Sequence, residues 1–123
     1  MGRRRRGGLN PGGGFSPKAI PNLIAWFDAS YITGLNDGDS INAELLDLSG
    51  NGYHCTQATA AQRPIIKKAI INNRDIIRFD ATDDNLILTN GGTIFQNKSG
   101  ATLFGVVLFN SLTGTRHYFF AST

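Results

Sequence analysis

Turn-forming residues recur about every eight to twelve positions after Asn22, and this spacing limits the possible fold more than any other feature of the chain. Glycine, asparagine and aspartate can adopt left-handed backbone conformations or bond to their own backbone, so clusters of them end strands. The clusters lie at residues 36–38, 50–52, 83–85, 90–92 and 113–114. The short apolar runs between them predict strands at residues 23–27, 40–41, 53–57, 64–66, 76–79, 86–88, 102–109 and 117–120.

Helix is a weak competitor in this sequence. Only residues 42–48 and 58–62 could make a helical turn or two, and neither run is long enough to show helical periodicity. Residues 65–71 contain two lysines, but the β-branched isoleucines of this run favour a strand. The pattern predicts an all-β fold, either a sandwich or a barrel.

Residues 1–21 form a different kind of segment. They are rich in glycine, hold three of the four prolines, and include the run Arg3, Arg4, Arg5, Arg6. We expect an extended arm that is ordered by a partner, whose carboxylates or phosphates would suit the four guanidinium groups. The chain has a net charge of +3, but without these arginines eight basic residues face nine acidic ones. Anion binding is therefore expected from the arm alone.

The sequence gives no sign of a membrane or secretion segment. No apolar stretch approaches the length of about 18 residues that predicts a membrane span, and glycines follow the basic start where a signal peptide would be apolar. The single cysteine excludes a disulfide within one chain. We expect a protein that is made in the cytoplasm and does not enter a membrane.

Four segments, taken in order, are similar to a known family. They are residues 21–30, 36–38, 47–57, and 63–64 followed by 77–86. Together they resemble concanavalin A-like, laminin-G-like modules of bacteriophage tail, fibre and head-surface proteins and of bacterial surface proteins. The resemblance covers about two thirds of the chain. It implies an antiparallel jelly-roll β-sandwich over residues 22–123, behind the arm of residues 1–21.

The chain departs from this family in two places. Leu45 and Leu46 stand where such modules often carry a second tryptophan. The modules also usually need more chain to complete both sheets. We therefore expect the sandwich to be incomplete at its C-terminal side, and to be completed either by further chain after Thr123 or by a neighbouring subunit.

Six residues have expected roles in forming the fold. Neighbouring side chains of a strand point to opposite faces, so one aromatic ring of the pair at 26–27 should enter the core. Asp28 should accept backbone N–H groups where that strand ends, and the turn at 50–52 should start a new strand. Phe79 should share the buried face of its strand with Ile77. The six are Trp26, Asp28, Gly50, Asn51, Gly52 and Phe79.

Catalysis is not expected. Glycoside hydrolysis needs two carboxyl groups, which the glucanase relatives implied by the resemblance supply as closely spaced glutamates, and the only glutamate here is Glu44. Asp47, Ser49 and His54 could be drawn as a catalytic triad, but the glycines beside the serine favour a turn. Two histidines and one cysteine lack the spacing of a zinc site.

The resemblance implies that calcium is the more credible metal, since laminin-G-like relatives can bind it through loop carboxylates. The candidate ligands are Asp80, Asp83 and Asp84, and the alternative role of these side chains is turn capping.

These observations predict a structural protein of a bacteriophage virion, as a fibre, tail or head-surface component. Its arm would dock on an acidic virion protein in preference to nucleic acid, and its oligomeric, lectin-like domain would present loops to host glycans. The alternative function is a carbohydrate-binding module of a bacterial surface or enzyme-associated protein.

Overall fold

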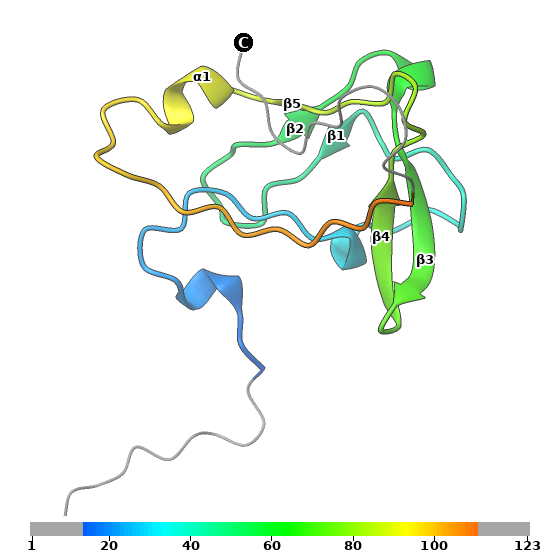
Figure 1. Ribbon diagram of the computed structural model, residues 1–123, viewed down its shortest axis with the longest axis horizontal. Helices are drawn as coiled ribbons and strands as arrows, with labels where there is room; N and C mark the ends of the chain where they lie inside the picture. Colours follow the sequence, from blue (N-terminus) through cyan, green and yellow to red (C-terminus); the bar gives the residue numbers. More distant parts are fainter. Residues whose placement is uncertain (1–13, 111–123) are drawn as a thin grey trace, which may run out of the picture.

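The computed structural model describes residues 14–110, which form a β-rich structure with little helix (Figure 1). Five short strands make two open sheets. The four arginines of the arm, the predicted turn at 113–114 and the predicted strand at 117–120 lie outside these residues.

The first sheet is three-stranded and antiparallel, in the order β1-β2-β5. Strand β1 is Glu44–Leu45, β2 is Cys55–Thr56 and β5 is Ile87–Leu88. Leu45 pairs with Cys55, which in turn pairs with Leu88. Two of these strands come from the predicted runs 53–57 and 86–88, whereas β1 falls in a run that was considered for helix.

The second sheet is a hairpin of β3, Ile65–Ile71, and β4, Arg74–Arg78. Asn72 and Asn73 join the strands with φ angles of 49° and 59°. Positive φ at both positions is the geometry of a type I′ turn, whose twist matches that of the strands, and asparagine tolerates it better than most residues. This turn was not among the predicted ones, although its sequence carries the signal.

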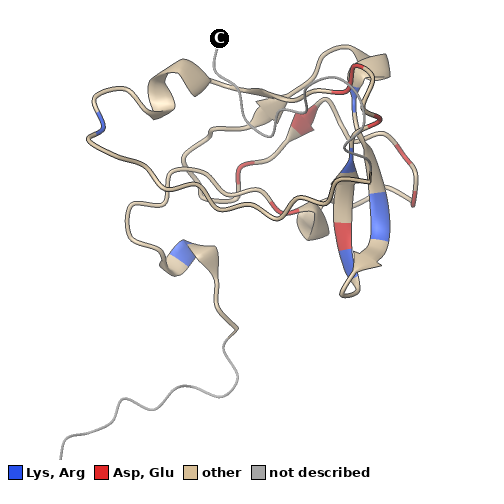
Figure 2. Cartoon of the chain, viewed as in Figure 1, with Lys and Arg blue, Asp and Glu red and all other residues tan. Residues whose placement is uncertain are grey.

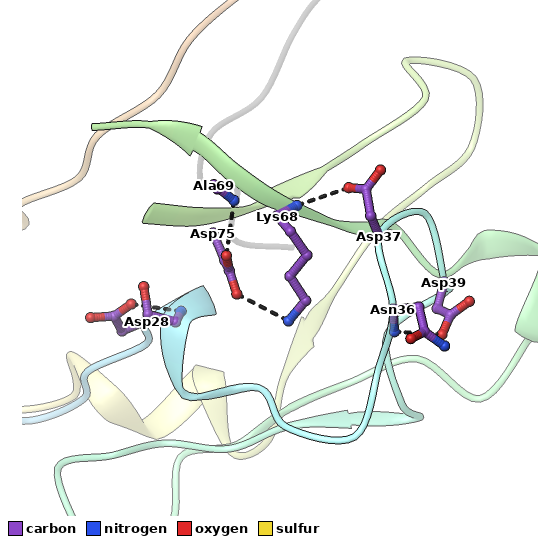
Figure 3. Close-up of polar contacts among 8 residues, drawn as sticks. Asp28, Asn36, Asp37, Asp39, Lys68, Ala69 and Asp75 are labelled. Atoms are coloured by element: carbon purple, nitrogen blue, oxygen red, sulfur yellow. Dashed lines mark hydrogen bonds and ion pairs between the residues drawn. The ribbon is translucent and has the colours of Figure 1, made fainter. Parts of the chain in front are cut away.

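An irregularity interrupts β3 between Lys67 and Ile71, where Ala69 has a φ of 52°. Side chains replace the lost strand pairing there. Asp37 accepts a hydrogen bond from the backbone of Lys68 at 2.9 Å, and Asp75 accepts one from the backbone of Ala69 at 3.0 Å (Figure 3). Lys67 and Lys68 add ion pairs to the same two carboxylates.

The core draws residues from both sheets. Ile41, Leu45 of β1 and Ile66 of β3 are 2%, 7% and 0% exposed and pack as one cluster. Partly buried apolar side chains surround it, including Cys55 of β2 and Ile77 of β4. Burial of this shared cluster holds the hairpin against the three-stranded sheet.

The helical elements are single turns. They are the 3-10 turns η1 (Pro17–Ala19), η2 (Ala29–Tyr31) and η3 (Ala60–Gln62), and the short helix α1 (Gly91–Ile94). Turn η2 packs against β4. Within residues 14–110 there is no helix of the length and apolar character that a membrane crossing would require.

Three predicted strands are corrected by the structure. Residues 23–27 are not in a strand, because the backbone there bonds to Asp47 and Leu48 instead of to a sheet. Residues 40–41 make only one bridge, between Ser40 and Ile65. Residues 102–109 are not in a strand either, and their apolar side chains are exposed, with Val106 at 92%. An apolar sequence favours a strand, but a strand also needs a partner for its backbone.

Candidate functional site

The most connected polar group in the described structure is the carboxylate of Asp47, whose residue is 7% exposed. It accepts backbone hydrogen bonds from Trp26 at 2.9 Å, Ser49 at 2.8 Å and Tyr53 at 3.1 Å. The hydroxyl of Ser49 donates to it as well, at 2.7 Å. We call Asp47, Ser49, Asn51 and His54 the Asp47 cluster.

Two further members of the Asp47 cluster tie distant segments together. The side-chain amide of Asn51 donates to the carbonyl oxygens of Leu23 and Ile24, each at 2.9 Å. Gly50 and Gly52 flank it with φ angles of 95° and 80°, which a residue with a Cβ adopts only at a cost. The turn therefore holds the segment before Trp26 in place.

The geometry of the Asp47 cluster does not form a catalytic triad. His54 Nδ1 accepts the backbone N–H of Asp47 at 2.9 Å, so this nitrogen is occupied by a main-chain donor. The hydroxyl of Ser49 faces Asp47 and the carbonyl of Ile24, and it accepts the N–H of Asn51. A triad needs the histidine between the serine and the carboxylate. Here the three side chains hold a turn.

The hydrogen bonds also set the charge state of Asp47. Burial acts to raise the pKa of Asp47, but the hydrogen bonds from Trp26, Ser49 and Tyr53 favour the charged form and together outweigh it. The pKa therefore lies below its ordinary value. Asp47 is a buried carboxylate that is charged at neutral pH and satisfied by donors of its own chain.

The three candidate calcium ligands do come together. The ligand atoms of Asp80, Asp83 and Asp84 all lie within 4.8 Å of one another. Calcium takes about six to eight oxygens, so these carboxylates would supply part of a coordination shell. Burial, together with the charges of its two neighbours, raises the pKa of Asp84.

The same carboxylates also shape their own loop. Asp80 accepts backbone hydrogen bonds from Thr82, Asp83 and Asp84 at 2.8 to 3.4 Å, and these lower its pKa. Asp84 accepts the N–H of Asp80 at 2.8 Å. Ala81, between them, has a φ of 65°. These contacts are turn capping, the role that the sequence gave as the alternative to calcium.

A concave site lies between η2 and the hairpin. It has a volume of about 430 Å³ and is lined by residues 14–17, Trp26, Asp28, Ser30, Tyr31, Arg74 and Asp75. We call it the Tyr31 cleft. Part of the predicted arm, from Gly14 to Pro17, thus borders the domain.

Two of the expected fold-forming residues help to build the Tyr31 cleft. Trp26 contacts Tyr31 edge to face, with ring centroids 5.5 Å apart. Asp28 precedes η2 and accepts the N–H of Ser30 at 2.9 Å. Phe79 differs from the expectation, because it follows the end of β4 and is 47% exposed. Ile77 alone of that pair packs on the core.

Charged side chains are sparse over most of the described structure (Figure 2). The hairpin carries both signs, with lysines and arginines beside Asp75. Lys67 pairs with Asp37, and Lys68 pairs with Asp75 at 3.0 Å. The arginine run of the arm lies outside the described residues.

No family model, curated protein or solved structure matches this chain. The geometry and chemistry of the chain itself therefore carry the functional argument.

Sequence reasoning considered Asp47 only as a member of a triad, and it missed Tyr31 and Arg74. A signal existed for Asp47, because an aspartate two residues before a serine commonly accepts that residue's backbone N–H. Tyr31 and Arg74 carried no comparable signal, because they meet only through the packing of η2 on β4.

Proposed function

We propose that this chain is a structural component of a bacteriophage particle, in which residues 22–123 form a jelly-roll β-sandwich and residues 1–21 anchor it. The Asp47 cluster is the observation that supports this most. It joins two of the segments that carry the resemblance, through the bonds from Trp26 to Asp47 and from Asn51 to Ile24. Its polar groups are used to hold loops, which suits a display module.

The charge distribution supports the anchoring role of the arm. The rest of the chain is close to neutral, and four adjacent guanidinium groups can bind carboxylates in a bidentate manner. We infer that the partner is an acidic virion protein, because basic and acidic residues nearly balance over residues 22–123, so the sequence outside the arm carries no excess positive charge that would follow nucleic acid.

The exposed apolar segment supports assembly with other subunits. Leu103, Phe104 and Val106 are 60%, 84% and 92% exposed, and exposed apolar patches commonly mark contact surfaces. A jelly roll that lacks strands in one chain would gain them from a neighbour at such a segment.

The test replaces Arg3, Arg4, Arg5 and Arg6 together by glutamine in the phage that encodes the chain. We expect the number of copies in each purified particle, counted by quantitative mass spectrometry, to fall by at least about tenfold, since several charge-assisted hydrogen bonds of about 1.5–3 kcal/mol each are lost. Replacement of Lys98 by glutamine removes a charge outside the arm and should leave the copy number unchanged.

Particles emptied of their genome separate the two partners of the arm. Retention of the chain after the nucleic acid is removed is expected for an acidic protein partner, and its release would assign the arginines to nucleic acid. An unchanged copy number in the glutamine variant would refute anchoring by the arm. A chain found on the bacterial surface and not in particles would refute the virion function and favour the carbohydrate-binding module.

A further inference from the structure

The Tyr31 cleft has the size of a small-molecule site, and its lining is mainly polar. Its volume of about 430 Å³ lies within the range of about 300–1,000 Å³ that is typical of such sites. Three separate parts of the chain form its walls: the segment of Gly14 to Pro17, the segment from Trp26 to η2, and the start of β4. A ligand there would contact all three.

The cleft offers an aromatic surface. Tyr31 is 58% exposed, and its ring is held edge to face by Trp26 at an interplanar angle of 74°. The contact restricts the ring while much of the residue stays open to solvent. The C–H face of a pyranose ring packs on surfaces of this kind.

Polar groups with free bonding capacity surround this ring. One oxygen of Asp28 accepts from Ser30, and the other accepts no hydrogen bond from the described residues. The hydroxyls of Ser30 and Tyr31 and the guanidinium of Arg74 likewise have no partner within residues 14–110. Both donors and acceptors are thus available to sugar hydroxyls, which need both.

Hydrogen bonds hold the wall of the cleft that the start of β4 forms. Figure 3 shows Asp75 bound to the backbone of Ala69 and to the ammonium of Lys68, on the hairpin beside Asp28. Both bonds are 3.0 Å long. Asp75 therefore positions the start of β4, and Arg74 next to it carries the unpaired charge.

We propose that the Tyr31 cleft binds a saccharide, with Tyr31 stacking on a sugar ring while Asp28 and Arg74 bond to its hydroxyls. The inference rests on the proposed function, a domain displayed on the particle, and adds to it a site for glycan contact. The carboxylates of Asp28 and Asp75 disfavour a multiply charged anion, although Arg74 is cationic. A single site of this size gives weak affinity, which many copies on one particle would raise by avidity.

The assay uses Trp26, the only tryptophan of the chain, which lines the cleft. The full chain is titrated with cellotetraose, maltotetraose, chitotetraose, lactose and 3′-sialyllactose, and binding is followed by tryptophan fluorescence and by calorimetry. We expect at least one of these sugars to bind with a dissociation constant of about 1 mM and to change the fluorescence.

Two variants and a control test the residues. Tyr31→Ala and Arg74→Gln should each weaken binding by about tenfold, whereas Tyr31→Phe keeps the ring and should stay within about threefold of wild type. Lys98→Gln removes an exposed cation outside the cleft and should bind as wild type does. Circular dichroism of each variant checks that the fold is intact.

The site is refuted if no sugar of the panel binds, if binding occurs without a change in fluorescence, or if Tyr31→Ala and Arg74→Gln bind as wild type does. A chain that binds sugar but is absent from particles would overturn the virion function and leave the cleft standing. A chain that is present in particles but binds no sugar would overturn the cleft alone.

Discussion

Replacement of Asp47 by alanine should be among the most destabilising single changes in this protein. The substitution leaves the backbone N–H groups of Trp26, Ser49 and Tyr53 without their acceptor. Each unsatisfied buried donor costs about 1–3 kcal/mol. Water can reach Ser49 and Tyr53, which are only half-buried, so we take the lower part of the sum and expect a loss of about 3–4 kcal/mol.

The consequence is measurable by urea denaturation and by thermal melting, each followed through the fluorescence of Trp26. At about 4–8 °C per kcal/mol for a domain of this size, the melting temperature should fall by at least about 12 °C. Asp47→Asn keeps one acceptor oxygen and should lose less, about 1–2 kcal/mol. The result would also appear as a loosened environment of Trp26, since its own N–H is one of the freed donors.

Asp83→Ala is the matched control for Asp47→Ala. Asp83 is exposed, and its carboxylate accepts no hydrogen bond from residues 14–110, so the change should stay within about 0.5 kcal/mol. Equal losses in the two variants would show that the hydrogen bonds to Asp47 do not stabilise the fold, and the reasoning about the Asp47 cluster would then be wrong.

Three further predictions follow from the same structure. Asp47 has a lowered pKa because its hydrogen bonds outweigh its burial, and Asp37 has a lowered pKa because of hydrogen bonds from Lys67 and Lys68. The stabilisation from both carboxylates is therefore present above about pH 4 and is lost as the pH falls further. Urea midpoints that stay constant from pH 5 to pH 3 would contradict this. Gly52→Ala should lower the free energy of unfolding by about 1–2 kcal/mol through the φ of 80° alone, because nothing lies within 4 Å of the added Cβ. Gly100→Ala is equally open but has no positive φ, so it should be neutral in the same melting experiment. Burial and, to a smaller extent, the charge of Asp47 raise the pKa of Cys55 to about 11. At pH 8 Ellman's reagent should therefore react at least about a hundredfold more slowly with the native chain than with the chain in urea. Comparable rates would refute this.

Local rules explain which parts of the fold were predictable. The β-branched run at 65–71 is β3, and the turn at 50–52 has the positive φ angles that its glycines allow. Both depend on the preferences of neighbouring residues. The prediction of a strand at 102–109 was wrong because strand formation also depends on distant residues: an apolar composition does not show whether a partner strand is within reach.

The sequence by itself determined that this chain is β-rich, that it turns at glycine and asparagine clusters such as the one at 50–52, and that its net positive charge comes from the arginine run of the arm. Only the tertiary structure decided the order β1-β2-β5, the hydrogen bond of Trp26 to Asp47 across 21 positions, and the placement of Tyr31 and Arg74 in one cleft. The physical reason is that periodicity and turn chemistry act between neighbours, whereas pairing and clefts depend on how the chain closes its long loops around the shared core.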